Sequence, residues 1–136
     1  MVKRLFLTIA VVALVLPACG GGDDGGVDVA LSDYVVAPAA SSASAGEITF
    51  NLTNEASQTH EFVIFRTDVS SDAMPVGAEG DVDEEGEGVE AIDEIEDIAA
   101  GADATLTVTL DAGSYVFLCN LPGHYRQGMH IGFTVS

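Results

Sequence analysis

The sequence predicts one all-β domain, a sandwich or barrel, over residues 27–136. From residue 27 onward, hydrophobic residues alternate with polar or small ones in several short runs, as in strands with one buried face. Glycine, serine and asparagine separate these runs, which is typical of sandwiches and barrels. The length also suits a single domain.

The expected strands differ in how they are buried. Those near the start, in the middle and at residues 105–110 alternate cleanly, so each has one face toward the core. The run from His60 to Phe65 becomes apolar on both faces toward its end. Asp111 to Gly113 forms a turn between two strands. The predicted strands cover residues 27–32, 48–52, 60–65, 105–110, 113–119 and 129–135.

The first 18 residues have the pattern of a signal peptide. Lys3 and Arg4 precede an apolar run over residues 5–16, which is too short to span a bilayer comfortably. The segment that follows, Leu-Pro-Ala-Cys, resembles a bacterial lipobox, which implies cleavage before Cys19 and lipidation of its sulfur. The alternative is an ordinary signal peptide in which Cys19 is incidental. Residues 19–26, rich in glycine and aspartate, are expected to form a flexible tether.

The charge of the exported chain is strongly negative. All 22 acidic residues follow Cys19, against two arginines, so the charge there is −20 with neutral histidine. Such a field disfavours nucleic acid and anionic lipid surfaces, and favours partners with a basic surface at low salt.

Residues 79–97 form an acidic insertion with eleven carboxylates in nineteen residues. Hydrophobic residues recur there at every third position, so a short helical turn is one interpretation. A solvated acidic insertion between strands is the favoured one. Asp81, Asp83 and Glu85 faintly resemble a calcium-binding loop, but Ile92 occupies the position of the bidentate glutamate, which argues against calcium.

The C-terminal segment combines three metal-binding side chains, with Cys119, His124 and Met129 spaced as Cys-x4-His-x4-Met. Thiolate, imidazole and thioether together suit copper, whereas zinc rarely accepts a thioether. Cys119 would also be an unpaired thiol in an exported protein if Cys19 is lipidated, and metal ligation would explain its persistence.

Strand phase brings these residues together. Cys119 shares the inward face with Tyr115 and Phe117, and Met129 begins the inward face of the last strand. Cys119 and Met129 therefore lie at facing ends of adjacent strands. Pro122-Gly123 bends the intervening loop, and Gly128 gives backbone freedom before Met129.

A second imidazole must come from elsewhere in the chain. His130 follows Met129 directly and points to the opposite face, whereas His60 begins a strand on the face of Phe62. His60 is therefore the predicted fourth ligand. Singly, Cys119 or Met129 would be an ordinary core residue, and His124 an exposed loop residue. Their joint arrangement predicts one copper ion.

Three motifs together resemble the cupredoxins, the family of plastocyanin and azurin. They are Val-x-Val-x-Leu-x-x-Tyr from Val27, Asn-x5-His-Glu-Phe-Val-Ile from Asn54, and Tyr-x-Phe-x-Cys-x-x-Pro-Gly-His-x4-Met from Tyr115. The resemblance covers nearly all of residues 27–136. It implies a Greek-key β-sandwich with one type 1 (blue) copper at one end. The four residues between Cys119 and His124 are similar to the spacing in azurin, auracyanin, rusticyanin and sulfocyanin.

One position departs from the best-known relatives. Plastocyanin and azurin have asparagine after the first ligand histidine, and its side chain ties the ligand loops together; here the residue is Glu61. An ionised glutamate accepts hydrogen bonds but donates none, so the surroundings of the ligands must differ. Glu61 and Asn120 are the residues expected beside the ligands.

The predicted function is outer-sphere transfer of single electrons outside the cytoplasm, at the membrane that holds the lipid anchor. His124 would be the route to the surface, within an apolar patch of Leu121, Pro122 and Tyr125, and redox proteins would be the partners of a monomer. The alternative is copper delivery or storage, although the chain is not rich in methionine. An enzyme with further copper would need more histidines than the single spare, His130. A metal-free sandwich would leave the ligand motif unexplained.

Overall fold

The structure is a computed structural model that describes residues 26–136. The predicted signal peptide, Cys19 and all of the predicted tether except Gly26 lie outside the described residues. Within them, no helix has the length and apolar character needed to cross a membrane.

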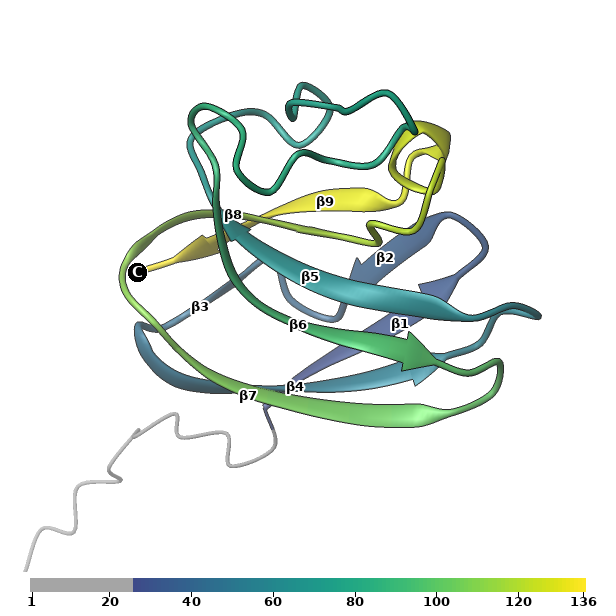
Figure 1. Ribbon diagram of the computed structural model, residues 1–136. Coiled ribbons are helices and arrows are strands. Elements are labelled where there is room, and N and C mark those ends of the chain that lie inside the picture. Colours follow the sequence, from purple (N-terminus) through teal and green to yellow (C-terminus); the bar gives the residue numbers. More distant parts are fainter. Residues whose placement is uncertain (1–25) are drawn as a thin grey trace, which may run out of the picture.

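Two mixed β-sheets pack face to face (Figure 1). The four-stranded sheet has the order β2-β1-β4-β7, and the five-stranded sheet has the order β3-β9-β8-β5-β6. A 3-10 turn, η1, lies between β8 and β9. The elements are β1 (Val27–Ser32), β2 (Val35–Pro38), β3 (Ser42–Ala43), β4 (Gly46–Asn54), β5 (His60–Arg66), β6 (Glu90–Ile98), β7 (Asp103–Leu110), β8 (Gly113–Leu118), η1 (Tyr125–Gln127) and β9 (His130–Val135).

The connections confirm the predicted all-β sandwich with Greek-key character. The chain passes from β4 to β5, from β6 to β7 and from β7 to β8 by changing sheets, rather than by adding neighbouring hairpins. β1 pairs in parallel with β4, and β3 in parallel with β9; the other strand pairs are antiparallel. All six predicted strands are present, while β2, β3 and β6 were not predicted.

The core between the sheets is built around four phenylalanines. The Phe50 ring lies within 5.1 to 6.1 Å, centroid to centroid, of the rings of Phe62, Phe117 and Phe133. These side chains come from β4, β5, β8 and β9, so one aromatic cluster joins both sheets. Cys119 and Met129 belong to the same buried cluster. The metal-binding residues are therefore an extension of the core at one end.

Strand direction places the predicted ligands at one end of the sandwich. β5 begins at His60, β8 ends one residue before Cys119, and β9 begins one residue after Met129. Since β5 and β8 are antiparallel, the start of one lies beside the end of the other. This end, called the ligand pole below, is on the right in Figure 1, where η1 also lies.

The acidic insertion does not contain the helical turn that was one interpretation of its spacing. Its second half is β6, an edge strand of the five-stranded sheet. The register against β5 shifts twice, between His60 and Phe62 and between Ile64 and Phe65, each time with one extra residue on β6. Such bulges interrupt the alternation of a strand, and they explain inward residues at every third position. The inward residues are Ile92, Ile95 and Ile98.

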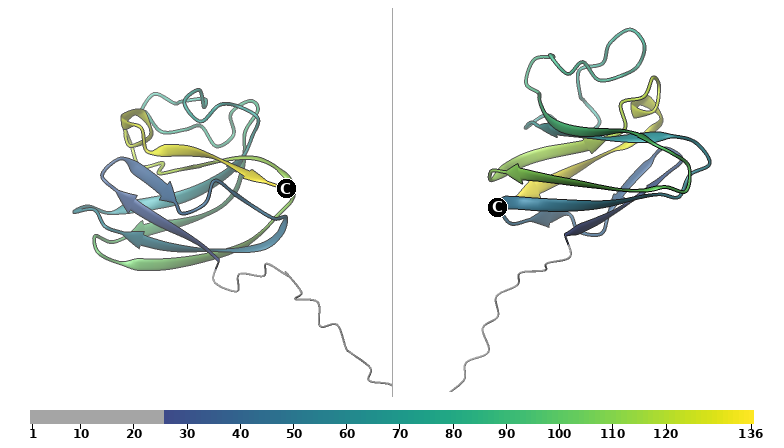
Figure 2. Two further views of the ribbon diagram at one scale, coloured as in Figure 1. Left: turned by 180° about the vertical axis from the view of Figure 1, so that it is seen from behind. Right: turned by 60° about the horizontal axis from the view of Figure 1, so that its bottom comes forward.

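Residues 67–89, called the cap segment, cover the outer face of the five-stranded sheet. Figures 1 and 2 show this segment on the side of that sheet away from the four-stranded one. It forms a second hydrophobic cluster with side chains from β5, β8 and η1. The buried members are Val63, Phe65, Met74, Val82, Val116, Leu118 and Tyr125. This second cluster explains why β5 is apolar on both faces.

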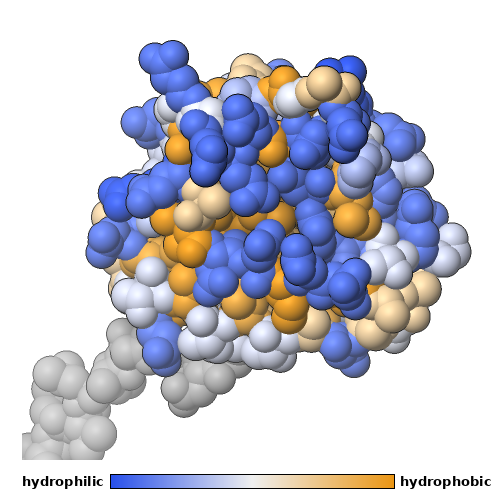
Figure 3. Space-filling view, in the orientation of Figure 1, coloured by the Kyte–Doolittle hydropathy of each residue, from blue (hydrophilic) through white to orange (hydrophobic). Residues whose placement is uncertain are grey.

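Hydrophilic side chains cover much of the face on which β6 and β7 lie, with hydrophobic surface between them (Figure 3). Along β6 the exposed residues are Glu90, Ala91, Asp93, Glu94, Glu96 and Asp97. Charged side chains on an edge strand oppose pairing with the edge of another sheet.

Replacing Phe50 by alanine is expected to lower the free energy of unfolding by about 3–5 kcal/mol, because it opens a cavity where both sheets meet. Urea unfolding of the copper-free protein measures the change. Val35→Ala is the control, since Val35 is 48% exposed, and it should change stability by less than about 0.5 kcal/mol. A loss at Phe50 no larger than in the control would contradict the assigned core.

Candidate metal centre

Three of the predicted ligands converge at the ligand pole. The Cys119 Sγ atom lies 3.4 Å from His124 Nδ1 and 3.8 Å from His60 Nδ1. The two Nδ1 atoms are 3.2 Å apart. Cys119 and His60 are each 0% exposed, and His124 is partly exposed. One sulfur and two ring nitrogens thus face a common point.

Met129 completes the group from the first position before β9. Its side chain is fully buried in the core with Cys119, and its carbonyl oxygen accepts a hydrogen bond of 3.1 Å from the Cys119 N–H. This bond continues the β8–β9 ladder to the metal-binding residues, so strand pairing sets the separation of the two sulfur-bearing residues. The predicted group of His60, Cys119, His124 and Met129 is therefore assembled.

The loop between Cys119 and Met129 bends where the sequence predicts it. The His124 N–H donates to the Leu121 carbonyl at 2.9 Å, and Gly123 has φ of +82°, which together define a turn with Pro122 and Gly123 at its centre. Gly128 then ends η1 in a left-handed conformation, with φ of +103°. Only glycine adopts such backbone angles readily, so this geometry holds His124 toward Cys119.

The protonation states of the three donors suit a bound cation. Desolvation lowers the pKa of His60, with a further decrease from nearby His124, and desolvation also lowers the pKa of His124. Both rings are therefore neutral at pH 7 and offer lone pairs. Desolvation raises the pKa of the Cys119 thiol, so burial alone disfavours the thiolate. A cation in contact with the sulfur would offset that penalty.

Backbone N–H groups also point at the sulfur. Glu61 N–H donates to Cys119 Sγ at 3.5 Å, and Leu121 N–H donates to it as well. Both bonds lower the pKa of the thiol, against the larger effect of burial. Donors aimed at a thiolate stabilise its charge and tune the metal that it binds.

Glu61 joins the two ligand-bearing segments, although it replaces an asparagine. Its side chain accepts a hydrogen bond from the Asn120 N–H, next to Cys119. Glu61 is only 8% exposed, and burial raises its pKa to about 7. Glu61 is the acceptor in this hydrogen bond, which agrees with the prediction that its side chain accepts hydrogen bonds rather than donating them. Glu61 and Asn120 therefore link the segments that carry His60 and Cys119.

Asn54 positions His60, a role that its place in the sequence motif does not reveal. Its side-chain amide donates to the carbonyl oxygens of Gln58, Ile98 and Ala99 at 2.8 to 3.2 Å, and its Oδ1 accepts from Ala56 N–H at 3.0 Å. Asn54 is fully buried at the end of β4. It therefore fixes the loop that leads into His60. The motif contains this asparagine, but two of its partners, Ile98 and Ala99, are more than forty residues away in the sequence.

The turn between β1 and β2 forms another wall of the site, also missed from the sequence. The Tyr34 ring meets His124 edge-on, with centroids 5.3 Å apart. Asp33 Oδ1 lies 3.7 Å from His60 Nε2, a buried ring nitrogen with no hydrogen-bond partner among the described residues. When the ring proton of His60 is on Nε2, it faces this carboxylate. The Nδ1 lone pair then points toward the metal-binding atoms of Cys119 and His124.

The predicted apolar patch around His124 needs one correction. Tyr125 is 5% exposed, because its ring is held in the second hydrophobic cluster and its hydroxyl bonds to the cap segment. It therefore adds almost no surface. Pro122 is exposed and Leu121 is partly exposed, and the partly exposed Tyr34 lies against His124.

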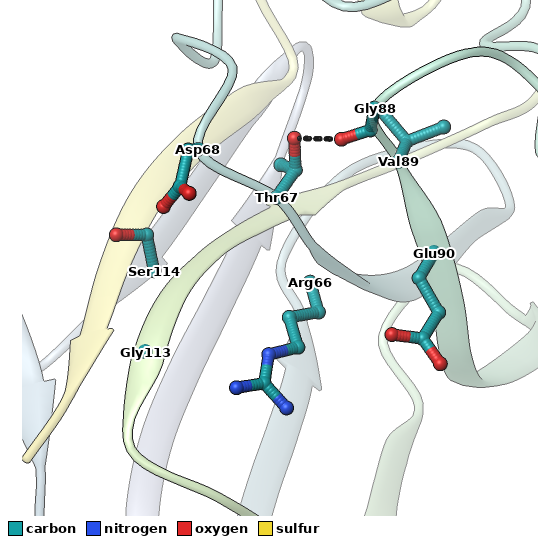
Figure 4. A pocket seen from close by; sticks show the side chains of 8 residues that line it. All are labelled: Arg66, Thr67, Asp68, Gly88, Val89, Glu90, Gly113 and Ser114. Atoms are coloured by element: carbon teal, nitrogen blue, oxygen red, sulfur yellow. Dashed lines mark hydrogen bonds between the residues drawn. The ribbon is translucent and has the colours of Figure 1, made fainter.

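The remaining histidine and a polar pocket both lie away from this centre. His130 packs on Tyr125, with ring centroids 4.7 Å apart, on the other face of β9. A pocket of about 480 Å³ lies around Arg66 and Gly113, at the opposite ends of β5 and β8 (Figure 4). It is lined by no cysteine or histidine and offers no site for a soft metal.

An all-β sandwich with a buried cysteine, two histidines and a methionine at one end defines a cupredoxin, whose metal is one type 1 copper. The residues present fit that ion in kind and in protonation. More specifically, the profile of the Sulfocyanin (SoxE) domain matches residues 24–136, and the chain belongs to that family. The family is one of electron-transfer copper proteins. No curated protein sequence matches the chain.

Solved structures give the same fold. Dithionite-reduced auracyanin from Roseiflexus castenholzii matches with 25% identity and a TM-score of 0.60, over 80% of this chain and 94% of that one. Auracyanin A from Chloroflexus aurantiacus matches with 20% identity and a TM-score of 0.51, over 80% and 99%. Rusticyanin from Thiobacillus ferrooxidans matches with 18% identity and a TM-score of 0.50, over 80% and 76%. The last two show likeness of fold alone.

Addition of cupric ion to the reduced apoprotein is expected to produce an intense visible band from thiolate-to-copper charge transfer. Cys119→Ser should abolish this band, because only this side chain supplies a thiolate to the site. The matched control is His130→Gln, which removes the histidine outside the donor group and should retain the band. Absorption titration decides the result, and a band that survives in Cys119→Ser would refute the assignment.

Asn54→Ala should lower the free energy of unfolding by about 2–4 kcal/mol, because it removes four hydrogen bonds to backbone groups of two segments, the loop before His60 and the end of β6. Urea unfolding of the apoprotein measures this loss. Asn51→Ala serves as the control, since Asn51 bonds with Asp28 in the exposed part of the same strand, and should cost less than about 1 kcal/mol. Equal losses in both variants would remove the special role given to Asn54.

Proposed function

We propose that this protein is an extracytoplasmic carrier of single electrons, a monomer held at a membrane by a lipid on Cys19. The observation that supports it most is the difference in exposure within the donor group: three ligands are fully buried and only His124 reaches the surface. Bound copper supplies a one-electron couple. The chain's part is to hold the donors in a water-poor site, to keep the thiolate ionised beside the metal, and to offer one conducting edge.

His124 is the proposed route for the electron. Its ring lies between the buried sulfur and the exterior, flanked by Pro122, Leu121 and Tyr34. A partly apolar surface of this size suits brief contacts between redox proteins. The other ligands lie behind it in the core, so a partner that docks here approaches the metal by the shortest path through a ligand.

Acidic residues beside the ligand pole support a partner with a basic docking surface. The pKa of Glu61 is raised by burial and additionally by Glu94, Glu96 and Glu84, and that of Glu94 by burial and then Glu84 and Glu96. These carboxylates are therefore close enough to interact, and Glu84 accepts a hydrogen bond from Asn120 at 3.2 Å. Their combined field would attract cationic partners toward the metal centre.

Copper delivery or storage is the rival function. A delivery site must let another molecule take the metal, whereas His60, Cys119 and Met129 are each 0% exposed. Two measured rates distinguish electron transfer from copper delivery. For an electron carrier, self-exchange of electrons between oxidised and reduced protein should be fast, and transfer of Cu(I) to a chelator slow. Slow self-exchange with rapid loss of copper would favour delivery instead.

Electron transfer with a small cationic reagent should depend on the acidic surface. The rate with hexaammineruthenium is expected to fall as salt rises to about 0.2 M, since salt screens the attraction, while ferricyanide should show the opposite trend. The double variant Glu94→Gln/Glu96→Gln should weaken both trends, as followed by stopped-flow absorption.

The control is Glu47→Gln/Glu90→Gln, which removes the same charge from exposed positions at the start of β4 and of β6, away from the ligand pole. It should leave the salt dependence close to that of the unmodified protein. If both double variants weaken the salt dependence equally, only the net charge of the protein matters. The proposal of a local acidic docking surface would then be wrong.

A further inference from the structure

The cap segment contacts the ligand loop, residues 119–129, on both sides of His124. This loop joins β8 to β9 and holds three of the four metal-binding residues. The cap segment lies over the outer face of the same sheet and reaches the loop from outside (Figure 2). Its buried anchors are Met74 and Val82, which are 4% and 1% exposed.

Before His124 in the chain, the side-chain amide of Asn120 forms two hydrogen bonds with the backbone of Val82, as a peptide group of a paired strand would. Val82 N–H donates to Asn120 Oδ1 at 2.6 Å, and Asn120 Nδ2 donates to the Val82 carbonyl at 3.0 Å. The same nitrogen lies 3.2 Å from Glu84 Oε1. Because Asn120 follows Cys119 directly and its own N–H bonds to Glu61, three segments meet beside the sulfur.

On the second side, Tyr125 follows His124 directly. Its hydroxyl donates to the Ser71 carbonyl at 2.8 Å and accepts from Met74 N–H at 3.0 Å. The ring is buried between the cap segment and β8. Both hydrogen-bonding capacities of the hydroxyl are therefore used by the cap segment, and the side chain cannot turn without losing them.

We propose that the cap segment is a positioning element for the copper centre, and that Asn120 and Tyr125 are its two points of attachment. Neither side chain is one of the four metal-binding residues. Each fixes the backbone next to a ligand, so Cys119 and His124 are held in place before the metal arrives. Preorganised donors lose less freedom on binding, which favours retention of copper in both oxidation states. Partners next to the ligands commonly change metal affinity by about 10–100-fold.

The test compares Asn120→Ala and Tyr125→Phe with matched controls from the rest of the fold. Asn51→Ala removes an asparagine bond to Asp28, and Tyr115→Phe removes a hydroxyl bond of 2.8 Å to the Asp111 carbonyl at the opposite end. Hydrogen exchange of the copper-free proteins reports on the loop, and transfer of Cu(I) to a chelator reports on the metal. The visible band of the Cu(II) forms reports on ligand geometry.

Each of the two cap variants is expected to speed exchange of amides in residues 120–128 by about tenfold or more, to release Cu(I) about tenfold faster and to shift the visible band. Exchange in β4 should be unchanged, and both controls should match the unmodified protein. The copper readouts rest on the proposed function, but the exchange readout does not. Failure of the unmodified protein to bind copper would therefore refute that function and leave this test intact.

Three outcomes would overturn the proposal. The first is unchanged loop exchange in both cap variants. The second is faster exchange throughout the domain, β4 included, which would mean that the contacts only stabilise the fold. The third is faster loop exchange with unchanged copper release and band position, which would mean that the loop is held but the centre does not need it. If Asn120→Ala does not fold, Tyr125→Phe decides alone, because it removes a single oxygen.

Discussion

The Cys119 sulfur is buried where its ionised form is unstable without a neighbouring cation, and much of the structure follows from that constraint. The apolar end of the core raises the pKa of the thiol, while two N–H groups and two neutral imidazoles surround it. A metal ion is the partner that makes this arrangement favourable. The sheets then serve to keep the other donors at the correct separation, since β8 and β9 are paired up to Cys119 and Met129.

The segments around the sulfur are held to one another more than to solvent. Asn54 ties the loop before His60 to the end of β6, Glu61 ties the start of β5 to the ligand loop, and Asn120 ties that loop to the cap segment. Each tie pairs a side chain with backbone groups of another segment. An asparagine or a glutamate can thus do locally what strand pairing does elsewhere in the sandwich.

Much of this arrangement was predictable from the sequence because it depends on local rules. Alternation located six strands and their inward faces, and phase alone separated His60 from His130. The Pro122-Gly123 turn was also predictable, since it needs only the properties of those two residues.

What could not be predicted depends on contacts between distant segments. β6 was not recognised because two bulges changed its period from two to three. Tyr125 was expected at the surface because its burial requires the cap segment, whose path no local pattern reveals. The roles of Asn54, Asp33 and Tyr34 likewise follow from partners more than twenty residues away. Pairwise tertiary contacts of this kind leave no periodic signal in a single sequence.

The parallel pairing of β1 with β4 has a consequence for the proposed membrane attachment. Val27 lies opposite Phe50 and Leu31 opposite Asn54, so the chain enters the sandwich at the end remote from the copper ligands. The six residues of β1 span about 20 Å. A domain standing upright on its N-terminal attachment would hold His124 at least that far above the bilayer. Redox groups lying flush with the lipid would then be reached only by tipping, whereas proteins that project into, or diffuse through, the aqueous compartment would meet the exposed imidazole directly.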